Sequence, residues 1–145
     1  MGRNLSPSSS QSKVNITADT NLLIRAAVQD DVRQARLAAK ALQNAEMVAI
    51  SVPAICEFVW VLRRGYKKSA SDISDAVRRL MNSANVVMNR PAVEVGLSVL
   101  DAGGDFADGV IAYEGAWLGA EEFLSFDTDA ISLLQSLGMR ARLLA

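Results

Sequence analysis

The sequence predicts an α/β protein with a mostly parallel sheet. Apolar runs of strand length alternate with longer segments in which apolar residues recur at helical spacing, as in folds where helices connect parallel strands. Proline, glycine and capping residues separate these segments. Acidic residues follow or interrupt several of the apolar runs. Together these observations favour an α/β domain with a polar site beside its sheet.

The expected elements follow one another along the whole chain. The strands are predicted at residues 14–18, 47–51, 86–88, 123–126 and 140–144. The helices are predicted at residues 21–28, 31–45, 53–65, 69–81, 91–100, 105–117 and 127–137. Pro53 suits a first helical turn, and Gly65 ends the helix that Pro53 begins. The sequence shows no internal repeat and no second domain.

Composition narrows the class of protein. A chain of 145 residues is most simply one domain with a substantial core, which we expect over residues 14–145. Residues 1–13 are polar and lack the apolar centre of a signal peptide, so we expect a disordered leader or an expression remnant there. No apolar run approaches the roughly 18–20 residues of a membrane helix. The single cysteine, Cys56, excludes an intrachain disulfide and favours the cytoplasm.

Charge gives no general affinity for nucleic acid. The formal net charge is −1, so any site for a nucleic acid must be local. Four basic residues follow Glu57 closely: Arg63, Arg64, Lys67 and Lys68. They form either a solvated surface or a groove for a phosphate backbone, and the sequence leaves both alternatives open.

Four acids beside apolar segments form the candidate site. Asp19 ends the first predicted strand, and Asp127 follows a later one. Glu57 interrupts a long apolar stretch, and Asp108 precedes a shorter one. A carboxylate in apolar surroundings is usually paired, protonated or bound to metal, because burying an unpaired charge is unfavourable. Ligands bind outside the carboxyl ends of parallel strands, so we expect the four acids to converge in one cleft there.

Most of these acids also have a structural alternative. Asp19 and Asp127 are placed to cap the helices that follow them. Asp105 is placed to cap the next helix, with Asp108 at its third position, although both residues could also face the cleft. Glu57 is the hardest to explain in this way, because it lies in the middle of a helix far from either cap. Only Arg63 or Arg64 is near enough in sequence to suggest an ion pair with it. The joint placement of the acids, rather than any one of them, favours a functional site.

The donor chemistry predicts a hard divalent cation. The chain has no histidine, and a cluster of carboxylates suits Mg²⁺ or Mn²⁺, whereas zinc normally recruits histidine or cysteine. Thr20, Asn21 and Thr128 stand next to the acids and could orient a carboxylate or a bound water. The lack of histidine also excludes a Ser-His-Asp or Cys-His nucleophile. Phosphatase chemistry through Asp19 stays open, although such enzymes want a second acid where this chain has Asn21.

Four motifs in order resemble a PIN domain, and most of all the VapC-type ribonuclease toxins of bacterial toxin–antitoxin pairs. The motifs are Asp19-Thr20-Asn21, Glu57 in Ile-Cys-Glu-Phe-Val-Trp-Val-Leu-Arg-Arg, Asp105-Phe-Ala-Asp108-Gly-Val-Ile-Ala, and Phe126-Asp127-Thr128-Asp129. The resemblance covers about residues 14–144 and implies a three-layer α/β/α fold. By position, Asp19, Glu57 and Asp108 match the core metal-binding acids, Asp127 the more variable fourth, Asn21 a small polar position and Asp105 an accessory acid. Gly109 stands where these toxins often have alanine.

The resemblance also implies an activity and partners. It implies an endoribonuclease dependent on Mg²⁺ or Mn²⁺, which forms a homodimer and is inhibited by a VapB-like antitoxin that covers the acidic cleft. The alternative is a PIN-like module that binds RNA or protein without cutting. Binding of RNA that is insensitive to a chelator, with no cleavage of any substrate, would indicate that alternative.

Overall fold

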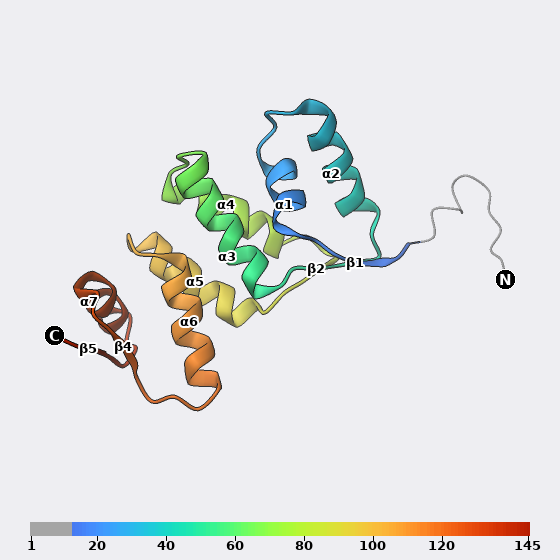
Figure 1. Cartoon of the computed structure of the whole chain (residues 1–145). Helices are drawn as coiled ribbons and strands as arrows, with labels where there is room; N and C mark the ends of the chain where they lie inside the picture. Colours follow the sequence, from blue (N-terminus) through green and yellow to red (C-terminus); the bar gives the residue numbers. More distant parts are fainter. Residues whose placement is uncertain (1–12) are drawn as a thin grey trace, which may run out of the picture.

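The structure is a computed structural model that describes residues 13–145, so the leader expected at residues 1–13 lies outside it except for Lys13. Its strands are β1 (Asn15–Thr17), β2 (Met47–Ala49), β3 (Val86–Val87), β4 (Phe123–Ser125) and β5 (Ala141–Leu143). Its helices are α1 (Thr20–Ala27), α2 (Val32–Asn44), α3 (Val52–Trp60), the π-helical turn η1 (Val61–Gly65), α4 (Ala70–Met81), α5 (Arg90–Asp101), α6 (Phe106–Trp117) and α7 (Thr128–Ser136). Every predicted element is present, and the α/β class is confirmed (Figure 1).

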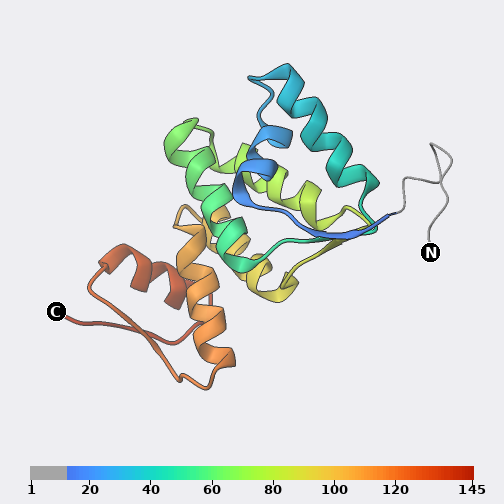
Figure 2. The ribbon, with the colours of Figure 1, turned by 45° about the vertical axis from the view of Figure 1, so that its right-hand side comes forward.

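All strand pairs are parallel, as predicted, and they form two sheets. The order of the first sheet is β1-β2-β3, and the second consists of β4 and β5. Both views of the ribbon place the β4–β5 pair and α7 beyond α5 and α6 from β1 (Figures 1 and 2). The acid after β1 and the acid after β4 therefore follow strands of different sheets, whereas we expected one shared edge.

Local capping explains where most helices begin. Asp31, Ser51, Ser69 and Asn89 each accept a hydrogen bond from a backbone N–H in the first turn of the helix that follows. Such caps satisfy donors that have no partner inside the helix. Residues 50 and 51, expected in a strand, instead lead into α3, because the Ser51 side chain caps that helix with Pro53 in its first turn.

The helix that carries Glu57 does not continue as a regular α-helix to Gly65. From Val61 to Gly65 it widens into η1, where the Tyr66 N–H bonds the Val61 carbonyl five residues back at 3.1 Å. A π-helical turn inside a helix shifts the side chains that follow it around the axis and often lies at a functional site. In this chain it determines where Arg63 and Arg64 lie.

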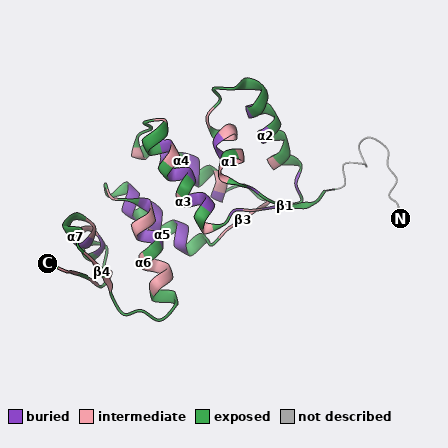
Figure 3. Cartoon of the chain, in the orientation of Figure 1, coloured by how far each residue is buried: buried purple, intermediate pink, exposed green. Residues whose placement is uncertain are grey.

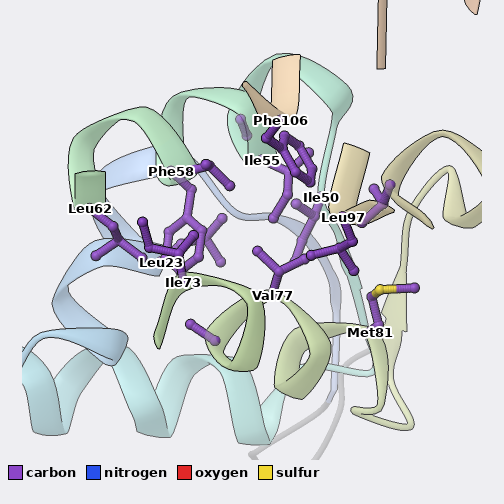
Figure 4. Packing of buried hydrophobic residues seen from close by; sticks show 14 of the residues in the cluster. Leu23, Ile50, Ile55, Phe58, Leu62, Ile73, Val77, Met81, Leu97 and Phe106 are labelled. Carbon is purple, nitrogen blue, oxygen red and sulfur yellow. The ribbon is translucent and has the colours of Figure 1, made fainter. Parts of the chain in front are cut away.

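The core lies between the first sheet and the helices around it (Figure 3). Phe58, Ile73, Val77 and Leu97 are at most 1% exposed and pack with the other apolar residues of this cluster (Figure 4). Phe58 and its buried neighbour Val59 anchor α3, the helix that carries Glu57. Within residues 13–145 no helix is long and apolar enough to cross a membrane.

Two glycines let α5 and α6 pack closely. A Cβ placed on Gly109 of α6 would lie 2.8 Å from the Val95 carbonyl oxygen and 2.9 Å from the Gly96 Cα of α5. A Cβ on Gly96 would lie 2.7 Å from the Phe106 ring. Real Cβ atoms essentially never show contacts this short, so a Cβ at Gly109 would push α5 and α6 apart, and one at Gly96 would displace the buried Phe106 ring. The chain has glycine at position 109 for packing, which outweighs the helix propensity that alanine would add.

Candidate functional site

A cleft of about 330 Å³ brings together residues from the middle and the end of the chain. It is bordered by the end of α3, by η1, by the loop between α5 and α6, by the first turn of α6 and by α7. Four acids border it, and we call them the cleft acids: Asp105, Asp108, Asp127 and Asp129. Asp129 was not predicted as a site residue, although its position two residues after Asp127 at a helix start was a usable signal.

The cleft acids are held by the helix starts on which they lie. Asp105 caps α6 by accepting a bond from the Ala107 N–H at 3.1 Å. Asp127 caps α7 by accepting bonds from the Asp129 and Ala130 N–H groups at 3.0 and 3.1 Å. The capping alternative is therefore confirmed for both residues. A capping carboxylate has a second oxygen and a fixed position, so capping and ligand binding are compatible here.

Asp108 is the electrostatically perturbed member of the cleft acids. Its pKa is raised from the ordinary value, first by burial and then by the negative charges of Asp105 and Asp127. Within residues 13–145, none of the three ion pairs involves a cleft acid. A bound cation would offset this concentration of negative charge.

The other two predicted acids lie outside the cleft and form a second group, which we call the α1–α3 acids: Asp19 and Glu57. Asp19 caps α1 through the Leu22 N–H at 2.8 Å, which confirms its capping role. The Thr20 hydroxyl donates to the Glu57 carboxylate at 2.8 Å and so ties the start of α1 to α3. Neither Asp19 nor Glu57 borders the cleft.

The expectation of apolar surroundings was wrong for most of the acids. Asp19, Glu57 and Asp127 are exposed, and only Asp108 is half-buried. Glu57 also makes no ion pair with Arg63 or Arg64 in the described chain. Each exposed acid lies at a helix cap or on an exposed part of a helix, and some apolar neighbours, such as Trp60 and Phe126, are exposed as well.

The residues expected to assist the acids lie beside them. Asn21 and Thr128 are exposed in the first turns of α1 and α7, next to the capping acids Asp19 and Asp127. Thr20 bonds Glu57, as described above.

The basic residues separate into two sets. Arg63 and Arg64 border the same cleft as the cleft acids. Lys68 instead lies in a different depression, with Arg79, Asp72 and Asp75 nearby. Lys67 is exposed, with a backbone φ of 55° in the turn after η1. Of the four basic residues, only the two arginines therefore border the cleft that the cleft acids border.

The acids of the site have the right ligand atoms for a divalent cation, but they are not close enough together to hold one. All the nearby charged donors are carboxylates, which suits Mg²⁺ or Mn²⁺. In the described part of the chain, however, no three acid, cysteine or histidine side chains are close enough to hold a metal ion. The cleft acids and the α1–α3 acids must approach one another for four carboxylates to act on one metal centre.

Fold and site together define an α/β protein with carboxylates gathered at helix starts and two arginines beside them. Comparison with protein families gives a match to the PIN domain over residues 16–133. The chain belongs to the PIN domain family. A search of curated proteins finds no match to the chain. PIN domains are typically nucleases, generally use divalent metals and bind RNA.

Proposed function

We propose that the protein is a metal-dependent endoribonuclease, the toxin of a VapBC-type toxin–antitoxin pair, and that residues 14–145 are its nuclease domain. The observation that carries the proposal is the cleft, in which Asp105, Asp108 and Asp127 meet Arg63 and Arg64 in a chain of the PIN family. Arginines beside an acidic centre can bind the phosphates of RNA. The acids can at the same time bind a cation, which offsets their negative charge.

Each acid has a defined part in this proposal. Asp108 and Asp127 at the cleft, together with Asp19 and Glu57 of the α1–α3 acids, would hold Mg²⁺ or Mn²⁺, directly or through water. When bound, the cation supplies an activated water for attack on the scissile phosphate and offsets charge on the leaving oxygen. Thr20 orients Glu57 through the 2.8 Å bond, and Asp105, Asn21 and Thr128 assist the neighbouring acids.

The proposal includes protein partners. Large apolar side chains are exposed along α6 and just after it, including Ile111, Trp117 and Leu118 at 57–80% exposure. Clustered exposed apolar side chains mark surfaces that bind other proteins. A VapB-like antitoxin and a second copy of the chain are the partners we propose in the cytoplasm.

Removal of metal is expected to stop RNA cleavage. The purified protein should cut a labelled mixed-sequence RNA in Mg²⁺ or Mn²⁺, and EDTA should abolish cutting, because the cation supplies the activated water. The measurement is the appearance of labelled fragments on a denaturing gel. Restoration of cutting when metal is added back in excess is the control. Cleavage that persists in EDTA would contradict the proposal.

A non-cleaving binding module is the second candidate. One observation favours it: in residues 13–145 no three potential ligands converge on a metal position. This candidate predicts RNA binding that is unchanged by EDTA and an absence of fragments from every substrate. The cleavage assay therefore separates the two candidates directly. The PIN family match gives no support to phosphatase chemistry at Asp19.

A further inference from the structure

Trp60 is an aromatic residue on the rim of the cleft that the proposed mechanism does not use. It ends α3 and borders the cleft together with Arg63, Arg64 and the cleft acids. Trp60 is 60% exposed, although its neighbours in sequence on the N-terminal side, Phe58 and Val59, are at most 5% exposed. Tryptophan is seldom so exposed, because its large apolar surface favours burial. The core therefore does not account for this side chain.

The position of Trp60 on its helix directs it toward the acids. Helix α3 packs against α6. Trp60 borders the cleft together with Asp105, which caps α6, and Asp108 in its first turn, so its side chain lies beside these acids.

We propose that the Trp60 indole stacks on a base of unpaired RNA whose phosphates contact Arg63 and Arg64. The inference rests on the proposed function and adds a residue that positions the RNA: Trp60 holds a base with a free face beside the scissile phosphate. Exposed aromatic side chains next to basic side chains bind single-stranded nucleic acids in this way, since every base has a face on which to stack. Bases inside a duplex present no free face.

The surroundings of Trp60 favour RNA over a protein partner. The exposed side chains that border the cleft with it are charged: Arg63, Arg64, Asp105, Asp127 and Asp129. Asp108 beside them is half-buried. The second tryptophan, Trp117, lies in a different depression with Tyr113, Glu114 and the exposed Leu118, away from the cleft acids and the two arginines. Trp117 is 76% exposed, so it is a matched control for exposure at a site without arginines.

The chain contains only these two tryptophans, so fluorescence can test each alone. The experiment uses Trp117→Phe, which keeps Trp60, and Trp60→Phe, which keeps Trp117. Both carry Asp19→Asn to prevent cleavage, and Mg²⁺ is present. Titration with a short single-stranded oligoribonucleotide is expected to quench the emission of Trp60 and to leave that of Trp117 unchanged. The same sequence annealed to its complement is expected to quench neither.

Affinity provides the second readout. In the Asp19→Asn background, Trp60→Ala is expected to weaken binding of the single strand about ten-fold, within the range for loss of one stacked base. Trp60→Phe should recover most of the affinity, because a phenyl ring also stacks. Leu37→Ala, at an exposed apolar residue of α2 that does not border the cleft, should leave the affinity unchanged. Thermal unfolding checks that each variant is folded.

The outcomes distinguish this inference from the proposed function. Tight binding of RNA with no quenching of Trp60 and no effect of Trp60→Ala would overturn the stacking role and leave the nuclease proposal standing. Equal quenching of Trp60 by duplex and single strand would overturn the assignment to unpaired RNA. Absence of RNA binding by the protein with native Trp60 and Trp117 would overturn both proposals together.

Discussion

Asp108→Asn is expected to abolish RNA cleavage while the protein stays folded. Asparagine has nearly the same shape as aspartate but lacks the negative charge that a hard cation requires. Changes to residues that only support a metal ligand already reduce activity about 10–100-fold, so loss of a ligand should reduce it by more. The fold should tolerate the change, because removing this charge relieves its repulsion with Asp105 and Asp127. The measurement is the rate of fragment release from labelled RNA in saturating Mg²⁺.

Asp19→Asn, in the α1–α3 acids, is also expected to abolish RNA cleavage while the protein stays folded. Asparagine caps helices as well as aspartate does, so the bond to the Leu22 N–H and the start of α1 should be kept. The matched control is Asp31→Asn. Asp31 caps α2 through the Gln34 N–H at 3.0 Å in the same way, but it does not border the cleft. Full activity of either Asp19→Asn or Asp108→Asn in metal-replete buffer would disprove the assignment of that residue.

Gly109→Ala is expected to destabilise the protein by about 1–3 kcal/mol, the usual range for forcing an extra carbon into a well-packed interior. The added Cβ would lie 2.8 Å from the Val95 carbonyl oxygen, so α5 and α6 would have to separate. This effect is opposite in sign to the gain in helix propensity of up to about 1 kcal/mol that replacing glycine with alanine gives elsewhere. Chemical denaturation followed by circular dichroism measures the difference.

Gly115→Ala in the same helix is the matched control. The nearest atom to a Cβ at Gly115 is the Ala120 Cβ at 3.9 Å, which is ordinary contact. This variant should therefore be as stable as the native protein or more stable. If Gly109→Ala were equally well tolerated, the close packing of α5 on α6 would not be a requirement of the fold.

Local signals in the sequence were sufficient to predict the helices and strands. They were insufficient to predict how the strands pair and how the helices pack. The start of α3 follows from Ser51 and Pro53, and the start of α4 follows from Ser69, because each signal acts within one helical turn. The pairing of β4 with β5 away from β1 depends on contacts between strands of three residues, which carry too little pattern to fix their neighbours. The π-helical turn η1 has no local signature of its own.

For the candidate site, too, the sequence predicted the residues better than their arrangement. The sequence predicted the acids, and the structure places Asp105, Asp108 and Asp127 around one cleft. It did not predict that Asp19 and Glu57 lie outside that cleft, since helix faces and strand neighbours decide this and neither is encoded locally. Trp60 was also missed as a site residue, although it follows Glu57 by three positions, which is close to one helical turn.

The central claim is that the cleft acids and the α1–α3 acids serve one metal centre. Calorimetric titration with Mn²⁺ of the native protein, Asp19→Asn, Asp108→Asn and Asp31→Asn tests it most directly, because it measures metal binding without RNA or turnover. The account predicts that Asp19→Asn and Asp108→Asn weaken the same binding event and that Asp31→Asn does not. Weakening by Asp108→Asn alone, with native Mn²⁺ affinity in Asp19→Asn, would show that the two groups are separate and would contradict the claim.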